Sequence, residues 1–187
     1  FPHRHEIDLH AAIEPAREVG GDLYDFAFID EHRLFFMIGD VSGKGVPASL
    51  FMAVTKALCK AEALRGDTAA TKIDAIVADA NAAISRENPG MLFVTAFVGI
   101  LDTRTGVIAF CNAGHETPYL LGPEGPPRLL QSIGGPPLCT VDEFAYPEET
   151  MTLAPGNTLV LYTDGVPDAR NNADEPYGAE RLTACLS

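Results

Sequence analysis

Two helical repeats follow one another directly in the chain, and strand patterns lie on both sides of them. Apolar residues recur at helical spacing in Pro47–Arg65, a helix that we expect to be mostly buried, and again in Ile73–Ile84. A doubly wound parallel sheet requires strands and helices that alternate regularly, and this order lacks that alternation. The order therefore predicts a layered α+β fold, in which antiparallel sheets pack against helices.

The expected strands are rich in alternating, β-branched or aromatic residues, and turns with glycine or proline separate them. They cover Ile7–Ile13, Leu23–Ile29, Leu34–Val41, Leu92–Leu101, Val107–Asn112, Thr117–Leu121, Arg128–Leu130, Met151–Leu153 and Leu159–Tyr162. The last two flank the turn sequence Pro155-Gly156-Asn157 and are expected to form a hairpin. A further helix is expected to begin near Gly178.

The length of 187 residues fits a single domain, 1–187, with a sizeable core. The longest strongly apolar run, Met91–Leu101, is well short of the ~20 residues that cross a bilayer as a helix, so no membrane contact is expected from this segment. The chain starts at Phe1 with charged residues close behind it and no apolar signal block. We therefore expect a domain excised from a longer chain.

Charge and cysteine usage exclude several classes of protein. Acidic residues outnumber Lys and Arg by 26 to 13, which gives a net charge of −13 and argues against nucleic-acid binding. The four cysteines lie far apart, without a C-x-x-C pair, so neither a zinc site nor a disulfide framework is expected. Reduced thiols are typical of a cytoplasmic protein. The sequence leaves the oligomeric state open.

Three aspartates stand beside glycines at the ends of expected strands. Asp22 follows Gly20-Gly21, Asp40 follows Gly39, and Asp164 precedes Gly165. Convergent carboxylates suit hard divalent cations, and glycine lets backbone oxygens and water approach a cation closely. An Asp-Gly pair is also a common turn, and the calcium-loop pattern is absent. Spacing alone therefore leaves both a metal site and three separate turns open.

Four longer strings contain these aspartates or lie between them. They are Ala16-Arg17-Glu18-Val19-Gly20-Gly21-Asp22-Leu23-Tyr24-Asp25, Gly39-Asp40-Val41-Ser42-Gly43-Lys44-Gly45-Val46-Pro47-Ala48, Asn112-Ala113-Gly114-His115 and Tyr162-Thr163-Asp164-Gly165-Val166. In identity and order they resemble the stage II sporulation protein E type branch of the metal-dependent protein phosphatases, which are similar to protein phosphatase type 2C. The resemblance spans most of the chain.

The resemblance implies a four-layer α-β-β-α sandwich of two antiparallel sheets flanked by helices. It implies two Mn²⁺ or Mg²⁺ ions, held by the carboxylates of Asp22, Asp40 and Asp164 and by the Val41 carbonyl. A water activated by the metals would attack phosphorus, so no residue of the protein serves as nucleophile. The implied substrate is phosphoserine or phosphothreonine on an anti-sigma-factor antagonist, the partner protein of this branch.

The family pattern continues beyond Ser187 through a last helix and a final strand with a further metal-binding aspartate, both apparently missing here. The alternative to a serine/threonine phosphatase is therefore a catalytically silent, phosphatase-like regulatory binding module. The three aspartates favour the enzyme, because a silent module has no need of metal ligands.

Four further residues lie within the strings. Lys44 is expected to contact an incoming phosphate, although a solvated lysine in a glycine-rich turn is the alternative. His115 is expected to be structural, because a neutral histidine readily hydrogen-bonds a loop backbone, although a general acid is the alternative. Tyr24 is expected to pack, and Asp25 to support a metal-bound water or to cap a turn.

Two other enzyme classes fail on their motifs. The phosphate-loop pattern G-x-x-x-x-G-K-[ST] does not fit Gly39–Gly45, because only three residues separate Gly39 from Gly43. A diguanylate cyclase loop would need Glu and Phe where Leu23 and Tyr24 follow Asp22.

Overall fold

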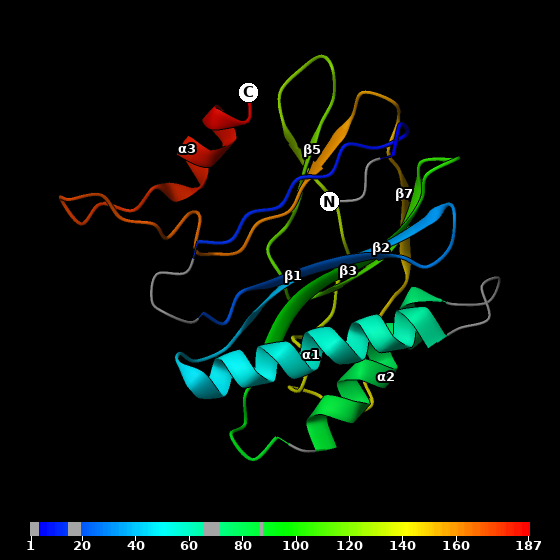
Figure 1. The fold of residues 1–187 in the computed structure, drawn as a ribbon. Coiled ribbons are helices and arrows are strands. Elements are labelled where there is room, and N and C mark those ends of the chain that lie inside the picture. Colours follow the sequence, from blue (N-terminus) through cyan, green and yellow to red (C-terminus); the bar gives the residue numbers. More distant parts are fainter. Residues whose placement is uncertain (1–3, 15–19, 66–71, 87) are drawn as a thin grey trace.

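Two antiparallel sheets and three helices make up the computed structural model, which describes residues 4–14, 20–65, 72–86 and 88–187 (Figure 1). The larger sheet has the strand order β1-β2-β3-β4-β7 and the smaller sheet the order β6-β5-β8. The strands of the larger sheet are β1 Leu23–Phe28, β2 Arg33–Val41, β3 Val94–Asp102, β4 Val107–Ala113 and β7 Glu149–Thr152. Those of the smaller sheet are β5 Tyr119–Leu121, β6 Arg128–Leu129 and β8 Thr158–Val160.

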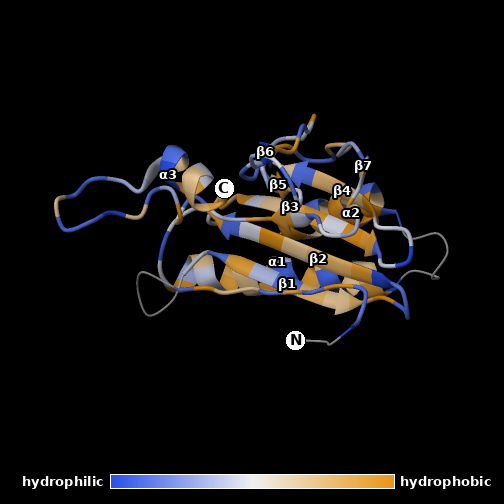
Figure 2. Ribbon diagram, turned by 90° about the horizontal axis from the view of Figure 1, so that it is seen from above, coloured by the Kyte–Doolittle hydropathy of each residue, from blue (hydrophilic) through white to orange (hydrophobic). Residues whose placement is uncertain are grey.

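Strands β2 and β3 lie at the centre of the larger sheet and separate two apolar cores. Because side chains alternate across a strand, Phe35 and Met37 of β2 face the helices, whereas Leu34 and Phe36 face the smaller sheet. Apolar residues dominate these strands in Figure 2, whereas the long connection before the last helix is mostly hydrophilic. The expected α+β fold with antiparallel sheets is confirmed.

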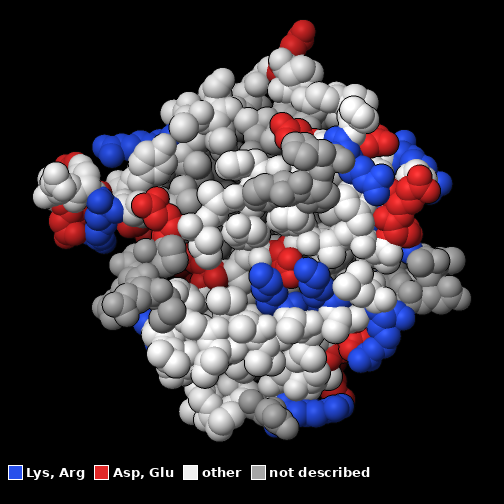
Figure 3. All heavy atoms as spheres, in the orientation of Figure 1, with Lys and Arg blue, Asp and Glu red and all other residues white. Residues whose placement is uncertain are grey.

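The two expected helices are α1 (Val46–Arg65) and α2 (Ile73–Arg86), which pack side by side on one face of the larger sheet (Figure 1). The prediction that the first helix is mostly buried was wrong. Only Ala48, Thr55, Cys59 and Ala63 of α1 are fully buried. Its outer face carries exposed Val46, Leu50, Val54 and Leu64, and Figure 3 shows a broad area without charged side chains over this helix.

Ile7–Ile13 does not form a strand, contrary to the prediction. Ile7 and Leu9 still pack against the core between the sheets, beside Phe26 and Phe28 of β1. The alternating pattern therefore reports alternate burial of side chains, which an extended segment can satisfy without pairing to a neighbouring strand.

The expected hairpin around Pro155-Gly156-Asn157 is also wrong. Strand β7 pairs with β4 of the larger sheet, whereas β8 pairs with β5 of the smaller one. The turn therefore carries the chain from one sheet to the other, and this crossing places the segment after β8 close to the ends of β1 and β2.

The helix expected near Gly178 is α3 (Gly178–Cys185), and the Tyr119 and Thr183 hydroxyls join it to β5 at 2.7 Å. The two sheets with helices on the larger one account for three layers, and the full four-layer arrangement stays a prediction. No helix in the described part of the chain is long and apolar enough to span a membrane.

Candidate metal centre

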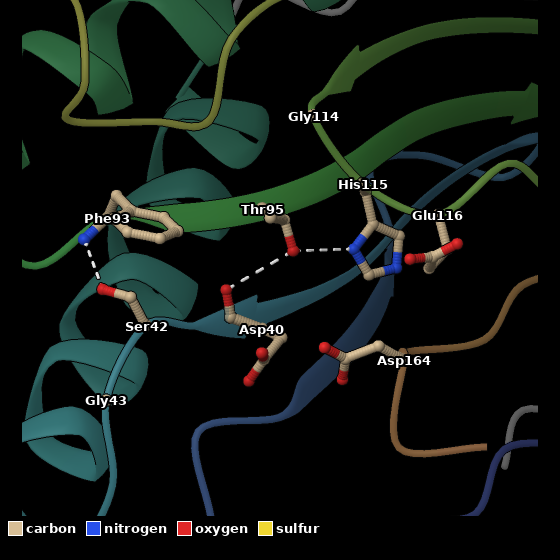
Figure 4. A pocket seen from close by; sticks show the side chains of 9 residues that line it. All are labelled: Asp40, Ser42, Gly43, Phe93, Thr95, Gly114, His115, Glu116 and Asp164. Atoms are coloured by element: carbon tan, nitrogen blue, oxygen red, sulfur yellow. Dashed lines mark hydrogen bonds between the residues drawn. The ribbon is translucent and has the colours of Figure 1, made fainter. Parts of the chain in front are cut away.

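The three aspartates singled out in the sequence lie at one end of the two sheets. Asp40 is the penultimate residue of β2, and Asp22 directly precedes β1, where Leu23 pairs with Gly39. Asp164 follows β8 after a short extended segment. Asp40 and Asp164 line a pocket of about 330 Å³, in which the Asp164 side chain points toward Asp40 (Figure 4). Two separate sheets therefore contribute acids to one site.

Asp22 forms hydrogen bonds with both Thr163 and Asp40. Burial raises the pKa of its carboxyl above the usual value, and hydrogen bonds from Thr163 and Asp40 partly oppose that shift. The negative charge of Asp164 raises the pKa further. Asp22 therefore interacts directly with Asp40 of the larger sheet and with the segment that carries Asp164.

The pKa of Asp40 is raised above that of an ordinary aspartate because its carboxyl is half-buried beside two other acids. Burial, followed by repulsion from Asp22 and Asp164, raises the pKa of Asp40 to about 6. The hydrogen bond between Asp40 and Asp22 raises the pKa of Asp40 and lowers that of Asp22. The three carboxylates therefore concentrate negative charge that a cation would offset.

Gly21 brings the backbone against two of the expected ligands. A Cβ atom on Gly21 would lie 2.7 Å from the Val41 carbonyl oxygen and 2.9 Å from Asp40 Oδ1. Only a residue without a side chain fits there. The same contacts show that the Val41 carbonyl and the Asp40 carboxylate lie on one side, so both oxygens can face a common ligand.

This donor set fits a hard divalent cation. Carboxylate and carbonyl oxygens are the ligands that Mg²⁺ and Mn²⁺ prefer, and a cation relieves the repulsion that raises the pKa of Asp22 and Asp40. Within the described residues, however, no three His, Cys, Asp or Glu side chains already stand in the arrangement of a metal site. Asp22 and Asp40 touch, whereas Asp164 acts on them only through its charge.

The structure places the remaining expected residues as follows. Lys44 is exposed and does not line the pocket, although its neighbour Gly43 does. Asp25 faces helix α1, where it forms an ion pair with Lys60 at 3.1 Å and accepts from the Phe26 amide at 2.8 Å, and it does not line the pocket. Tyr24 packs as expected, with its ring stacked on Phe26 at 6.4 Å. Residues 16–19 of the first string lie outside the described part of the chain.

Sequence reasoning missed several residues of the pocket. Thr95, Phe93, Ser42 and Glu116 line it together with His115 (Figure 4). Ser42 and Phe93 are joined by two bonds, since the Ser42 amide donates to the Phe93 carbonyl at 2.8 Å and Ser42 Oγ accepts from the Phe93 amide at 2.9 Å. No local motif marks Thr95 or Phe93, because strand pairing brings β3 alongside β2.

His115 is buried and neutral, in agreement with the expected structural role. Burial lowers the pKa of its imidazole to about 4, and a backbone contact with Tyr162 opposes this only in part. The ring therefore carries no charge near neutral pH.

Comparison with known proteins identifies the family of the chain. The family model described as stage II sporulation protein E (SpoIIE) matches residues 30–187. The chain belongs to this family. The resemblance that the four strings indicated is thereby confirmed.

The chain is similar to several curated proteins. It is 32% identical to protein IcfG of Synechocystis over 210 residues, which cover 100% of this chain and 33% of the relative. It is 24% identical to the phosphoserine phosphatase RsbP of Bacillus subtilis, covering 87% of this chain and 40% of RsbP. For the phosphoserine phosphatase RsbU of the same organism, the identity is 24% and the covered shares are 90% and 49%. The chain thus spans between a third and a half of these relatives.

Solved structures agree on the fold. The RsbU and RsbW domains of a Mycobacterium tuberculosis protein match with a TM-score of 0.72 and 26% identity, covering 92% of this chain and 46% of that one. The SiaA-PP2C domain of Pseudomonas aeruginosa matches with a TM-score of 0.71 and 23% identity, covering 89% and 65%. The SpoIIE-family chain therefore has a PP2C-like fold.

Proposed function

We propose that this SpoIIE-family chain is the catalytic domain of a metal-dependent protein serine/threonine phosphatase. The observation that carries the proposal is the gathering of Asp22, Asp40 and Asp164 at one end of the sheets, where burial and then repulsion from the other two acids raise the pKa of Asp40 to about 6. Such a cluster is costly without a cation and is suited to binding one. The names of RsbP and RsbU, both phosphoserine phosphatases, agree with this activity.

The residues that would hold two Mn²⁺ or Mg²⁺ ions are Asp22, Asp40 and Asp164 through their carboxylates and Val41 through its carbonyl. When bound, such ions supply a nucleophilic water at neutral pH and neutralise charge on the phosphoryl group. Gly21 leaves the space that these ligands need, since a side chain there would meet both the Val41 carbonyl and the Asp40 carboxylate.

The charge of the pocket supports a need for cations. Among the described residues that line it, the charged ones are Asp40, Glu116 and Asp164, and all three are acidic. A phosphate dianion would be repelled by this lining in the absence of metal. Lys44, beside the pocket-lining Gly43, would attract the phosphate from the rim.

The proposed substrate is a phosphoserine or phosphothreonine residue on an anti-sigma-factor antagonist protein, as expected for this branch of phosphatases, and the proposed location is the cytoplasm. The chain covers only 40% of RsbP and 49% of RsbU, so regulation by other segments of a longer protein is part of the proposal.

A second candidate is a silent, phosphatase-like regulatory module. It is favoured by one observation, namely that no three acidic, His or Cys side chains among the described residues already stand in a metal-binding arrangement. A silent module would keep the pocket for binding a phosphoprotein without hydrolysing it.

Hydrolysis measurements separate the two candidates. A chromogenic aryl phosphate and a phosphoserine peptide are incubated with the protein in Mn²⁺, in Mg²⁺ or in chelator, and calorimetry measures Mn²⁺ binding in parallel. The same assays are made on a chain extended beyond Ser187. Hydrolysis that requires metal supports the phosphatase. If neither chain hydrolyses the substrates with or without metal, and neither binds Mn²⁺, the regulatory module is supported.

A further inference from the structure

His115 lies where the chain passes from one sheet to the other. Strand β4 of the larger sheet ends at Ala113, and β5 of the smaller sheet begins at Tyr119. The acids of the candidate centre are divided between the same two halves, since Asp40 belongs to β2 whereas Asp164 follows β8. A side chain at this crossing is therefore able to contact both halves at once.

The backbone of His115 is held firmly by Asn112. The His115 amide donates to Asn112 Oδ1 at 2.8 Å, and Asn112 Nδ2 donates to the His115 carbonyl at 3.1 Å. The Asn112 carbonyl in turn accepts from the Gly135 amide at 2.8 Å. These bonds fix the turn without the imidazole, and the imidazole itself is buried, with only 7% of the residue exposed.

One side of the ring is tied to the larger sheet. His115 Nδ1 lies 3.0 Å from Thr95 Oγ1, and the same hydroxyl lies 3.5 Å from the Asp40 backbone carbonyl (Figure 4). The shorter contact favours Thr95 as the donor to Nδ1, which leaves the proton of the neutral ring on Nε2. With its proton on Nδ1, the hydroxyl has none left for the Asp40 carbonyl, and the connection to Asp40 is the strand pairing that sets Thr95 directly opposite it in the β2–β3 register.

The other side of the ring faces the segment that leads to Asp164. Nε2 is buried and has no aligned hydrogen bond among the described residues. The Tyr162 backbone lies on this side of the ring, since its contact with the imidazole raises the pKa of His115 and Nδ1 is already occupied by Thr95. Tyr162 lies two residues before Asp164, so a contact between His115 Nε2 and Tyr162 affects the position of Asp164.

We propose that His115 is a positioning residue, which links Asp40 of the larger sheet to the Tyr162–Asp164 segment and so sets how closely Asp164 approaches the other acids. Its neutral Nε2–H faces the Tyr162 backbone and restrains that segment already in the metal-free protein. This role explains why a buried histidine with an unsatisfied nitrogen stands beside the pocket: in the described structure Asp164 acts on the other two acids only through charge.

A residue that positions a metal ligand, as proposed for His115, has a measurable effect on metal affinity. Groups that orient the ligands typically change metal affinity by about 10- to 100-fold when they are removed. The inference rests on the proposed metal site for its functional consequence, whereas the link between the two sheets exists independently of any metal.

The first test is therefore made without metal. Hydrogen exchange is measured in EDTA on the wild type, Thr95→Val and His115→Asn, with Ile76→Val in the buried face of α2 as the control for general destabilisation. The reporters are the turn amides of Val166 and Asp168, which donate to the carbonyls of Thr163 and Asp164. Asn at position 115 retains a polar group near Thr95 but cannot reach Tyr162.

Both site variants are expected to exchange several-fold faster at these turn amides, with β3 and α2 unchanged, whereas Ile76→Val leaves the turn as in the wild type. Unchanged turn exchange in His115→Asn overturns the proposal. Acceleration spread evenly over the chain also overturns it, because that outcome describes a residue that stabilises the fold as a whole.

The second test measures Mn²⁺ affinity by calorimetry in the wild type, His115→Asn, Asp164→Asn and the double variant. His115→Asn is expected to bind Mn²⁺ about tenfold more weakly. The double variant is expected to bind no more weakly than Asp164→Asn, because His115 acts through that residue. Wild-type affinity in His115→Asn, or losses that add in the double variant, overturn the role. A wild type without Mn²⁺ binding refutes the proposed function, and the exchange result then decides the inference alone.

Discussion

Gly21 lies directly against Asp40, since a Cβ atom on Gly21 would be 2.9 Å from Asp40 Oδ1. The backbone carbonyl of Val41 would be nearer still, at 2.7 Å, and a backbone atom cannot rotate away as a side chain can. This close approach joins the segment before β1 to the end of β2, and it places two oxygen ligands beside a residue that adds no bulk.

Gly21→Ala is the direct test of this approach. The added methyl group forces the two segments apart, which we expect to cost about 1–3 kcal/mol in unfolding free energy and to weaken Mn²⁺ binding. The control is Gly90→Ala, whose Cβ would meet only the Leu92 side chain at 3.5 Å. Urea unfolding and Mn²⁺ calorimetry measure the two effects. Wild-type Mn²⁺ affinity in Gly21→Ala would show that the ligands lie elsewhere.

Removal of a ligand charge separates function from folding. Asp40→Asn and Asp164→Asn are expected to lose metal-dependent phosphate release while they keep the circular dichroism spectrum of the wild type. In EDTA, Asp40→Asn is expected to be more stable than the wild type by about 1 kcal/mol at neutral pH, because a half-buried, repelled carboxylate is removed and solvent screens part of its effect. Asp174→Asn, at an exposed position of the loop before α3, is the control. Unchanged turnover in both site variants contradicts the assignment of the metal site.

The pH dependence of that stability has a definite sign. The pKa of Asp40 is raised to about 6 in the folded protein, so its stabilising contribution is complete below pH ~3.8 and is lost as the pH rises through ~6. The pKa of His115 is lowered to about 4, so its contribution is present above pH ~6.5 and is lost as the pH falls through ~4. The two effects oppose one another between pH 4 and 6 in the wild type.

The variants separate these opposing effects. In EDTA, the unfolding free energy of Asp40→Asn relative to the wild type should increase from pH ~4 to ~6 and then stay constant. For His115→Asn, the same difference should decrease over this range. Urea unfolding at half-unit steps of pH checks both slopes, and a difference that is flat for Asp40→Asn would mean that its carboxyl titrates normally in the folded protein.

The sequence predicted the helix pair and the central strands because their signals are local. The helical repeat in α1 and α2 extends over several turns, which a strand cannot match, and the continuous apolar run in β2 fits burial on two faces. Pairing between β7 and β8 was predicted wrongly because turn residues end a strand without choosing its neighbour. That choice depends on which sheet the next strand joins, and the decisive contacts are distant in sequence.

The residues of the candidate site also fall into those that a local sequence pattern predicts and those that depend on distant contacts. Asp22, Asp40 and Asp164 were found because each stands in a recognisable string. Thr95 carries no such mark, and only its pairing opposite Asp40 in the β2–β3 register reveals it. The contact between His115 and Thr95 likewise arises from the pairing of β3 with the end of β4, where Ala96 and Gly114 form a bridge, and no local pattern encodes it.

Lys44 was predicted either to attract the phosphate of the substrate or to be a solvated residue of the turn. Gly43 and Gly45 on either side of it have positive φ angles of 95° and 77°, so the turn directs an exposed lysine away from the core beside the pocket. A charge at the rim attracts an anionic substrate but makes no contact that is specific to the transition state. We therefore expect Lys44→Ala to raise KM for a phosphoserine peptide about twofold to fivefold, with kcat unchanged.

Salt provides the control for this electrostatic effect. The Debye length falls from about 10 Å at 0.1 M to about 3 Å at 1 M ionic strength, so the difference in KM between Lys44→Ala and the wild type should vanish in high salt. Lys56→Ala, on α1, should leave KM unchanged at both ionic strengths. A loss of kcat in Lys44→Ala would instead assign the lysine to the transition state. Equal KM values in low salt would identify it as a solvated turn residue, because a lysine that attracts phosphate must act most strongly where screening is weakest.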